Sequence, residues 1–377
     1  MTTPGYPAAR AVAARIQSHF SRHLKESQEP QKIAPHPDEG VIESIVDAAF
    51  WASLRREEGI PPTISLAYLP PSLAGHPITF ERPVHLVPEA LTKLAPAVAR
   101  PGIHLGVWHH EGVLCIWGAT LTLPAFCFVI EVIEPGLLVI KHRREQELTK
   151  FVNVAVLEGD QVKVLDHQAA HLSDSPALVA SLLGFDSPGI SGDATNVLIQ
   201  LAVSMREHKR GGSLLVVPND KEHWRESIVG VTPYAVAPSY AKLAALIQLD
   251  DPQKEQPRWQ DALRRVVDVV AGLTAVDGAM VLNRRFELLA FGAKIGRREA
   301  FPRIENVIET EPVEGNIART VTPSQLGGTR HLSAAQFAQD QPDALALVAS
   351  QDGRFTIFAW SAVEQMVHAY RVEALLL

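Results

Sequence analysis

Cysteine is almost absent from this chain, and so are several motifs that would assign a chemistry at once. Only Cys115 and Cys127 occur among the 377 residues, and both lie in apolar runs. Buried free thiols in a reducing compartment are the simplest interpretation, and a disulfide between them is the minority alternative. There is no Gly-Lys-Ser/Thr phosphate loop, no Gly-x-Gly-x-x-Gly fingerprint and no Gly-x-Ser-x-Gly nucleophile motif. The familiar signatures of P-loop nucleotidases, dinucleotide-binding dehydrogenases and serine hydrolases are therefore missing.

An excess of positive charge is also missing. The chain has 35 Lys and Arg residues against 42 Asp and Glu residues, a formal net charge of −7. This balance argues against binding of DNA or RNA by bulk charge, although local arginines can still hold a small anion. The first residues lack the basic and apolar segments of a signal peptide, so we expect a cytoplasmic protein.

One apolar stretch, Val113 to Ile133, is long enough to cross a bilayer. It contains Gly118 and Glu131, and Pro124 divides it into two halves rich in strand-forming residues. Two buried strands are therefore expected here, and no membrane span.

The length favours two domains, which we place at residues 1–180 and 190–377. In the first, apolar residues at helical spacing predict helices from Pro7 to Leu24 and from Glu39 to Arg56. Residues 60–170 then alternate short apolar runs with turn residues, which is typical of strands. Strands are expected at Ile64–Leu69, Thr79–Glu81, Leu105–Trp108, Val113–Trp117, Phe126–Val132, Leu137–Lys141, Val152–Glu158 and Gln161–Asp166. The N-terminal domain is thus predicted to be a β-rich α+β domain.

The second domain alternates helical and strand patterns, which predicts an α/β fold with a mixed sheet flanked by helices. Helices are expected at Thr195–Lys209, Tyr240–Leu249, Trp259–Ala275 and Val363–Leu377. Strands are expected at Ser213–Val217, Met280–Leu282, Phe286–Phe291, Leu345–Ala349 and Phe355–Phe358. The three leucines that end the last predicted helix suggest docking or an oligomer contact.

Two short strings in this second domain carry residues suited to phosphate chemistry. Asp277, Gly278 and Ala279 place an acid and a flexible backbone position at the edge of a predicted strand. About fifty residues later, Gly328, Thr329, Arg330 and His331 form a predicted loop with free N–H groups, a hydroxyl and a guanidinium. An acid for a metal or a ribose hydroxyl, opposite a cradle for phosphate, is a common way to hold a nucleotide.

These strings resemble the Asp-Gly-Ala and Gly-Thr-Arg-His-Arg motifs of the diadenylate cyclase domain, the nucleotide-binding module of DNA-integrity-scanning proteins. Gly211 to Val217 is similar to the first core strand of that domain, and Asp343 to Ser350 is similar to its last motif. The resemblance covers about residues 194–365, with the four segments in the family's order. It implies a nucleotide-binding fold in which Asp277–Ala279 and Gly328–His331 contact the nucleotide.

Three departures from the family pattern affect catalysis. Leu332 replaces an arginine, Ala275-Val276 replaces Leu-His, and Ser350-Gln351-Asp352 replaces Ser-Glu-Glu. Condensing two ATP molecules needs in-line attack, metal assistance and neutralised phosphate charge, and the departures remove one arginine and one or two carboxylates. The resemblance is therefore to the variant branch of probable sensors, sometimes labelled DACNV, which would recognise a nucleotide or a cyclic dinucleotide.

The alternative is an active cyclase that uses Mg²⁺ or Mn²⁺, with Asp277 as the catalytic acid and Asp277 and Asp352 as metal ligands. In that family two domains face each other, each with one ATP, so activity would require a homo-oligomer.

Simpler interpretations of the same residues also stay open. Asp277 fits a turn, Thr329 fits the cap of a helix starting at Leu332, and His331 fits a structural role. Arg284 and Arg285 are expected at a hairpin tip. Lys294, Arg297 and Arg298 form a basic loop that either clamps phosphate or is only exposed.

His104, His109, His110 and Glu111 cluster in sequence, but no metal-binding spacing accompanies them, so we expect no metal there.

Overall fold

The computed structural model describes residues 5–26, 33–143, 151–166, 192–230, 234–249, 257–299 and 301–377, together with Val179 and Thr232. The chain divides into two compact units, Met1–Asp166 with Leu377 and His167–Leu376. Most of the interval in which the sequence places a domain boundary, 170–192, lies outside the described residues. The same holds for much of the linker from Gln28 and of the polar break from Asp250.

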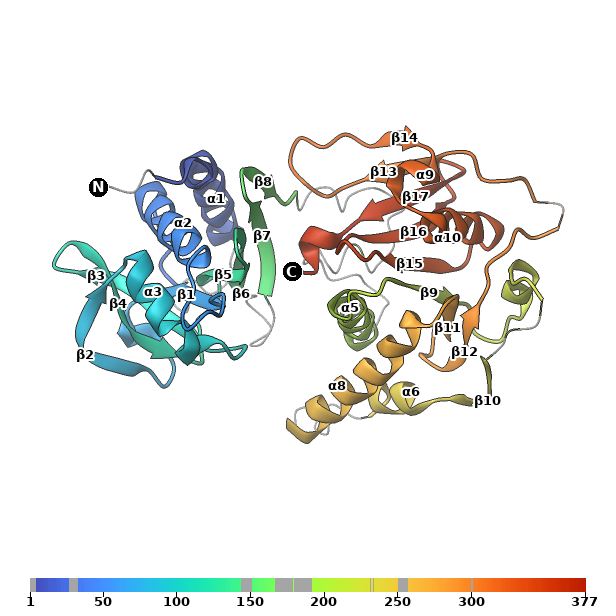
Figure 1. The fold of residues 1–377 in the computed structure, drawn as a ribbon, viewed down its shortest axis with the longest axis horizontal. Helices are drawn as coiled ribbons and strands as arrows, with labels where there is room; N and C mark the ends of the chain where they lie inside the picture. Colours follow the sequence, from blue (N-terminus) through green and yellow to red (C-terminus); the bar gives the residue numbers. More distant parts are fainter. Residues whose placement is uncertain are drawn as a thin grey trace. The chain divides into compact units, whose positions relative to one another are not determined.

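Two helices in the first unit follow the apolar stripes seen in the sequence (Figure 1). Helix α1 spans Pro7–Glu26, and helix α2 spans Glu39–Ser53. Val12, Ile16 and Phe20 of the α1 stripe are at most 2% exposed, so this face of the helix packs into the core. Helix α2 begins after Asp38, whose side chain accepts a 2.8 Å hydrogen bond from the Val41 N–H and satisfies one donor of the first turn.

An eight-stranded mixed sheet forms the rest of the first unit. Its strands are β1 (Ile64–Tyr68), β2 (Ile78–His85), β3 (His104–His110), β4 (Val113–Thr120), β5 (Phe128–Glu134), β6 (Leu137–Arg143), β7 (Phe151–Glu158) and β8 (Gln161–Val164). They are ordered β2-β4-β3-β1-β5-β6-β7-β8, and only the β1–β3 pair is parallel. A short helix, α3 (Pro88–Leu94), connects β2 to β3 with the 3₁₀ turn Ala95–Val98. All eight predicted strands are present, with shifted ends.

The cysteine and membrane expectations both concern this sheet. Cys115 on β4 and Cys127 before β5 are free and buried, as the apolar runs around them predicted. The stretch Val113–Ile133 forms β4 and most of β5. No helix in the described part of the chain is long and apolar enough to cross a membrane.

A buried histidine makes the stability of the first unit depend on pH. His104 is 3% exposed, and its Nδ1 lies 2.7 Å from the Ser65 hydroxyl. Burial lowers the pKa of His104 to about 4, and this effect outweighs the opposing influence of Glu131. The unfolded chain therefore binds a proton below pH 6.5 that the folded chain takes up only near pH 4. The contribution of neutral His104 to stability is fully present above about pH 6.5, and roughly 3 kcal/mol of it is lost as the pH drops to about 4.

We expect His104→Asn, which keeps a hydrogen-bonding atom near Ser65, to remove most of this pH dependence. Hydrogen exchange of the β1, β3 and β5 amides between pH 4.5 and 7 measures it, after correction for the intrinsic exchange rate. His110→Asn, at an exposed position on the same strand, is the control and should keep the wild-type slope. Identical slopes for the wild type and His104→Asn would contradict the assignment.

The second unit is built on a nine-stranded mixed sheet (Figure 1). Its strands are β9 (Gly212–Val217), β10 (Tyr234–Tyr240), β11 (Ala279–Asn283), β12 (Leu288–Ala293), β13 (Val307–Thr310), β14 (Arg319–Val321), β15 (Leu345–Ala349), β16 (Phe355–Ser361) and β17 (Met366–Arg371). The order is β10-β12-β11-β9-β15-β16-β17-β13-β14, and β9–β11 and β13–β17 are the parallel pairs. The helices are α5 (Gly192–Glu207), α6 (Lys242–Ile247), α8 (Pro257–Gly272), α9 (Pro323–Leu326) and α10 (Thr329–Asp340), with 3₁₀ turns at His223–Ser227, Leu273–Ala275 and Glu373–Leu375. This is a mixed α/β architecture.

Helix α10 covers one face of the central strands. It contacts β9, β15, β16 and β17, and its Ala334 and Phe337 share a core with Leu215, Val281 and Ala346. Side chains alternate between the faces of a strand, so the intervening residues of β9 and β11 point to the other face. Helices α5 and α8 pack against each other, and α5 also contacts β15.

The predicted C-terminal helix, Val363–Leu377, is wrong. The segment forms strand β17 and the 3₁₀ turn Glu373–Leu375, and β17 pairs antiparallel with β16 along its full length. The chain reverses before β17, where Gln365 has a φ of 51° and the Glu364 N–H donates to the Ser361 hydroxyl. This reversal gives Val367 and Tyr370 partners in the sheet, and it overrides the apolar composition that suggested a helix.

Other boundaries differ from the sequence predictions for local reasons. Tyr240 ends the unpredicted strand β10, so the helix expected from Tyr240 begins at Lys242. The strand expected from Phe286 begins at Leu288, because Phe286 has a φ of 63° within the β11–β12 turn. Arg284 and Arg285 do lie in that hairpin, whereas the short strands β13 and β14 were not predicted.

Candidate functional site

A cavity of about 780 Å³ opens in the second unit at the edge where β9 and β11 begin and β12 and β15 end. The sequence motifs meet there, although about fifty residues separate them. The nominated residues that line it are Asp277, Gly278, Ala279, Gly328, Thr329, Arg330, His331 and Asp352. The residues of the two motifs, together with Asp352, therefore lie around one concavity.

A row of small side chains forms the sheet side of the cavity. Ala279 at the start of β11 is paired with Ala293 on β12 and with Ser213 on β9, and Ser213 is paired with Val348 on β15. All four residues line the cavity. Three of these four adjacent positions carry alanine or serine, and such small side chains leave space above the sheet that larger apolar residues would fill.

Asp277 precedes β11 and reaches the cavity because Gly278 lets the backbone at the start of β11 pass close to the backbone of β12. Gly278 has a φ of 108°, and a Cβ atom there would lie 2.4 Å from the carbonyl carbon of Gly292. Only glycine fits this position without displacing backbone. The Asp277 side chain is exposed, and it forms no hydrogen bond or ion pair within the described part of the chain.

The opposite wall is the first turn of helix α10. The sequence expectation of a loop followed by a helix from Leu332 is wrong, because the helix starts at Thr329 and its N-cap is Gly328. Thr329 is therefore the first helical residue and not the cap. The N–H groups of Thr329 and Arg330 have no acceptor within the helix, and a helix N-terminus with such groups attracts anions.

Arg330 adds a full positive charge to this end of the helix. Its side chain is exposed, and it makes no ion pair in the described part of the chain. One terminal nitrogen lies 3.2 Å from the position that a Cβ atom of Gly211 would occupy. The guanidinium thus lies beside the start of β9 with its donors available.

His331 is buried beneath the cavity. It is 3% exposed, its Nε2 has no hydrogen-bond partner among the described residues, and its ring meets Phe358 edge to face. Burial lowers the pKa of His331, so the imidazole is neutral near pH 7. A Cβ atom on Gly327 would lie 2.3 Å from the His331 Nδ1, which explains the glycine there. The unpartnered nitrogen is a polar group that a ligand or a water molecule would satisfy.

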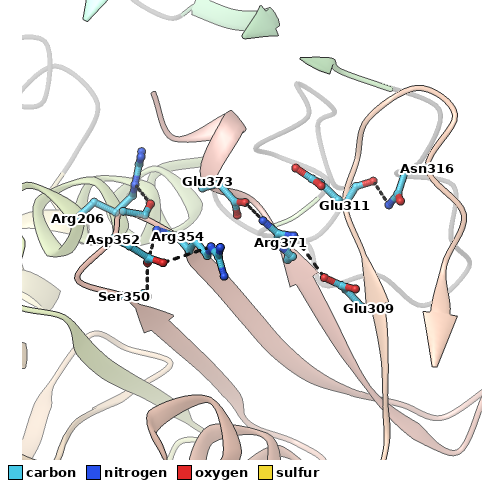
Figure 2. A network of polar contacts seen from close by, with 10 residues as sticks. Arg206, Glu309, Glu311, Asn316, Ser350, Asp352, Arg354, Arg371 and Glu373 are labelled. Carbon is cyan, nitrogen blue, oxygen red and sulfur yellow. Dashed lines mark hydrogen bonds and ion pairs between the residues drawn. The ribbon is translucent and has the colours of Figure 1, made fainter. Parts of the chain in front are cut away.

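Asp352 lines the cavity, but its carboxylate is already engaged (Figure 2). Ser350 donates to it at 2.6 Å, and Arg354 lies 3.4 Å from it. The Ser350 hydrogen bond is the main cause that holds the pKa of Asp352 below its usual range. In the same network Arg206 of α5 donates to the Gly353 carbonyl at 3.0 Å, which fixes the turn after Asp352.

A metal site would need additional ligands. Across the ranges that the structure describes, no three His, Cys, Asp or Glu side chains are grouped to hold a metal ion. Asp352 is paired with Arg354, whereas Asp277 has no partner among the described residues, so those residues offer one free carboxylate at the cavity. A divalent cation at this place would need oxygen ligands from a bound phosphate.

Sequence reasoning did not assign several lining residues to the site. Ser213 was predicted only as part of a strand. The glycines before it, Gly211 and Gly212, are the sequence signal that could have indicated a close approach of other groups to the backbone at this edge. Ser333 also lines the cavity, and its position one turn after Thr329 places both residues on the same side of α10. Lys294 of the predicted basic loop lines the cavity, whereas Arg297 and Arg298 are not among its lining residues.

A match to a known protein family covers part of the first unit. Residues 31–121 match the family described as "Probable sensor domain DACNV". No curated protein matches the chain. The matched residues run from before α2 to just beyond β4 of the first unit, so they do not include the cavity of the second unit. The resemblance drawn from the Asp-Gly-Ala and Thr-Arg-His strings concerns residues outside the match.

Proposed function

We propose that the second unit binds a nucleotide or a cyclic dinucleotide in the cavity between Asp277 and Arg330. The protein would act as a nucleotide sensor with little or no catalytic activity. The match of residues 31–121 to a probable sensor domain supports the sensing role. The resemblance of residues 194–365 to the diadenylate cyclase domain supports the choice of ligand.

The observation that carries the proposal is the pairing of unlike groups across one cavity. The N-terminus of α10 and the unpaired Arg330 provide donors and positive charge on one side. The unpaired Asp277 provides an acceptor on the other side, suited to ribose hydroxyls or base N–H groups. A volume of about 780 Å³ is within the usual range of about 300–1,000 Å³ for small-molecule sites.

The charges around the cavity favour binding over catalysis. Phosphoryl transfer depends on metal ions and on cations that neutralise the developing charge. Leu332 contributes no charge, and Asp352 is held by Ser350 and Arg354. Binding needs only the donors of Arg330 and the helix N-terminus.

An active diadenylate cyclase is the second candidate, and the free carboxylate of Asp277 favours it. A cyclase would need Mg²⁺ or Mn²⁺ and a second copy of the chain. Purified protein incubated with ATP and Mn²⁺ should give no cyclic dinucleotide under the sensor proposal. Turnover that Asp277→Asn abolishes would instead establish the cyclase.

The binding proposal predicts a thermal shift with nucleotides. A ligand at about a hundredfold over its dissociation constant stabilises the folded state by ~2.7 kcal/mol, or about 5–10 °C for a unit of this size. The measurement is a melting curve with each member of a panel of mononucleotides, triphosphates and cyclic dinucleotides. At least one should raise the melting temperature, whereas ribose and inorganic sulfate serve as controls. No shift across the panel would leave a scaffold with a decayed site.

A further inference from the structure

A second cavity adjoins the proposed nucleotide site. It has a volume of about 370 Å³, and it shares Ile295 and Ser333 with the first cavity. Leu332 and Gln336 of helix α10 line one side, and the segment between β12 and β13 supplies Arg297 and Arg303 on the other. The two cavities therefore lie along consecutive turns of one helix.

The charged side chains among the described residues of this second cavity are both positive. Arg297 and Arg303 are exposed, and neither forms an ion pair within the described ranges. Their neighbour Arg298 does pair, with Glu226 at 2.5 Å. The nearest acid on the helix, Asp340, is occupied by the Gln336 amide at 2.8 Å and by the Arg298 N–H at 2.7 Å. None of the described residues that line this cavity carries a negative charge.

Two polar side chains of α10, Ser333 and Gln336, line the second cavity. Gln336 is 7% exposed and all its polar atoms are used: Oε1 accepts from the Ile304 N–H, and Nε2 donates to the Pro302 carbonyl and to Asp340. These bonds fasten the segment that carries Arg303 to the helix. The Ser333 hydroxyl lies between the cavities and makes no hydrogen bond with the described residues.

We propose that this second cavity is an anion subsite that takes a second phosphate of the ligand. Arg330 and the helix N-terminus hold one phosphate, Ser333 lies between the two positions, and Arg297 and Arg303 hold the other. The ligand class is thus a nucleotide with phosphate charge at two separated positions, either a nucleoside polyphosphate or a cyclic dinucleotide. This inference rests on the proposed function of the first cavity.

The test compares ligands that carry the same base. AMP, ATP and cyclic di-AMP are titrated by calorimetry, together with GMP, GTP and cyclic di-GMP. In the wild type, a probe with two phosphate positions should bind at least about tenfold more tightly than its monophosphate, since a charge-assisted hydrogen bond contributes about that factor. If the triphosphate binds more tightly than the monophosphate, the second phosphate belongs to a nucleoside polyphosphate. If the cyclic dinucleotide does so, the second phosphate belongs to a cyclic dinucleotide.

The double variant Arg297→Gln/Arg303→Gln should reduce this ratio to within about twofold while monophosphate binding stays unchanged. Arg284→Gln/Arg285→Gln removes the same charge at the β11–β12 hairpin, which lies at the end of these strands away from the cavity. This control should keep the wild-type ratio of the two affinities. The subsite alone is overturned if the double variant keeps the wild-type ratio of two-phosphate to monophosphate affinity. It is also overturned if the wild type binds the monophosphate clearly but shows a ratio near one. Absence of binding by every probe to the wild type overturns the subsite together with the nucleotide site.

Discussion

Replacing Arg330 with glutamine should weaken nucleotide binding by roughly 10- to 100-fold. The guanidinium has no carboxylate partner in the described part of the chain, so its donors are available to a phosphate. Glutamine keeps a donor but loses the charge and the two-pronged geometry. Calorimetric titration of the best nucleotide from the panel measures the loss.

The Arg330 variant should fold normally, because an exposed side chain without partners contributes little to stability. Arg285→Gln is the matched control. It removes one exposed arginine from the hairpin at the other end of β11, where only a 3.5 Å contact with Asp220 is lost. If both variants bind the nucleotide as tightly as the wild type, the phosphate role of Arg330 is wrong.

Replacing Gly278 with alanine should destabilise the second unit by roughly 2–4 kcal/mol. Two costs add at this position: alanine is strained at a φ of 108°, and its Cβ would lie 2.4 Å from the Gly292 carbonyl carbon. Relief requires β11 and β12 to separate beside Asp277, so nucleotide affinity should fall as well. Urea unfolding, with hydrogen exchange of the β11 and β12 amides as the local readout, measures the effect.

Gly353→Ala separates the two costs. Gly353 has a φ of 86°, but nothing lies within 4 Å of the position of an added Cβ atom. Its substitution should cost about 1 kcal/mol from strain alone. If Gly278→Ala and Gly353→Ala lower the free energy of unfolding equally, the close contact with Gly292 does not contribute to the destabilisation.

The sequence predicted the strands of the first unit because each apolar run is short and ends in turn residues. The strand order was not predictable, since β1 pairs with β3 and β5 through contacts far apart in the chain. The prediction of a helix at Val363–Leu377 was wrong for a related reason. Its composition is apolar, and only the pairing with β16 decides that Met366–Arg371 is a strand.

Within the candidate site, the sequence identified residue types that bind phosphate, and their convergence required the fold. Asp277 and Arg330 reach one cavity because β11 and α10 both begin at the same edge of the sheet. The small residues beneath them could not be identified, because Ser213 and Ala293 are ordinary strand residues until register pairs them with Ala279. The second cavity was also missed, since it depends on how the segment carrying Arg297 and Arg303 folds back onto α10.

The central claim is that a nucleotide occupies the cavity between Asp277 and Arg330, and hydrogen exchange with and without the nucleotide tests it most directly. The account predicts slower exchange in peptides that cover residues 277–279 and 328–333, because the ligand would bind these backbone segments. Protection confined to other segments, with these two unchanged at saturating nucleotide, would contradict it.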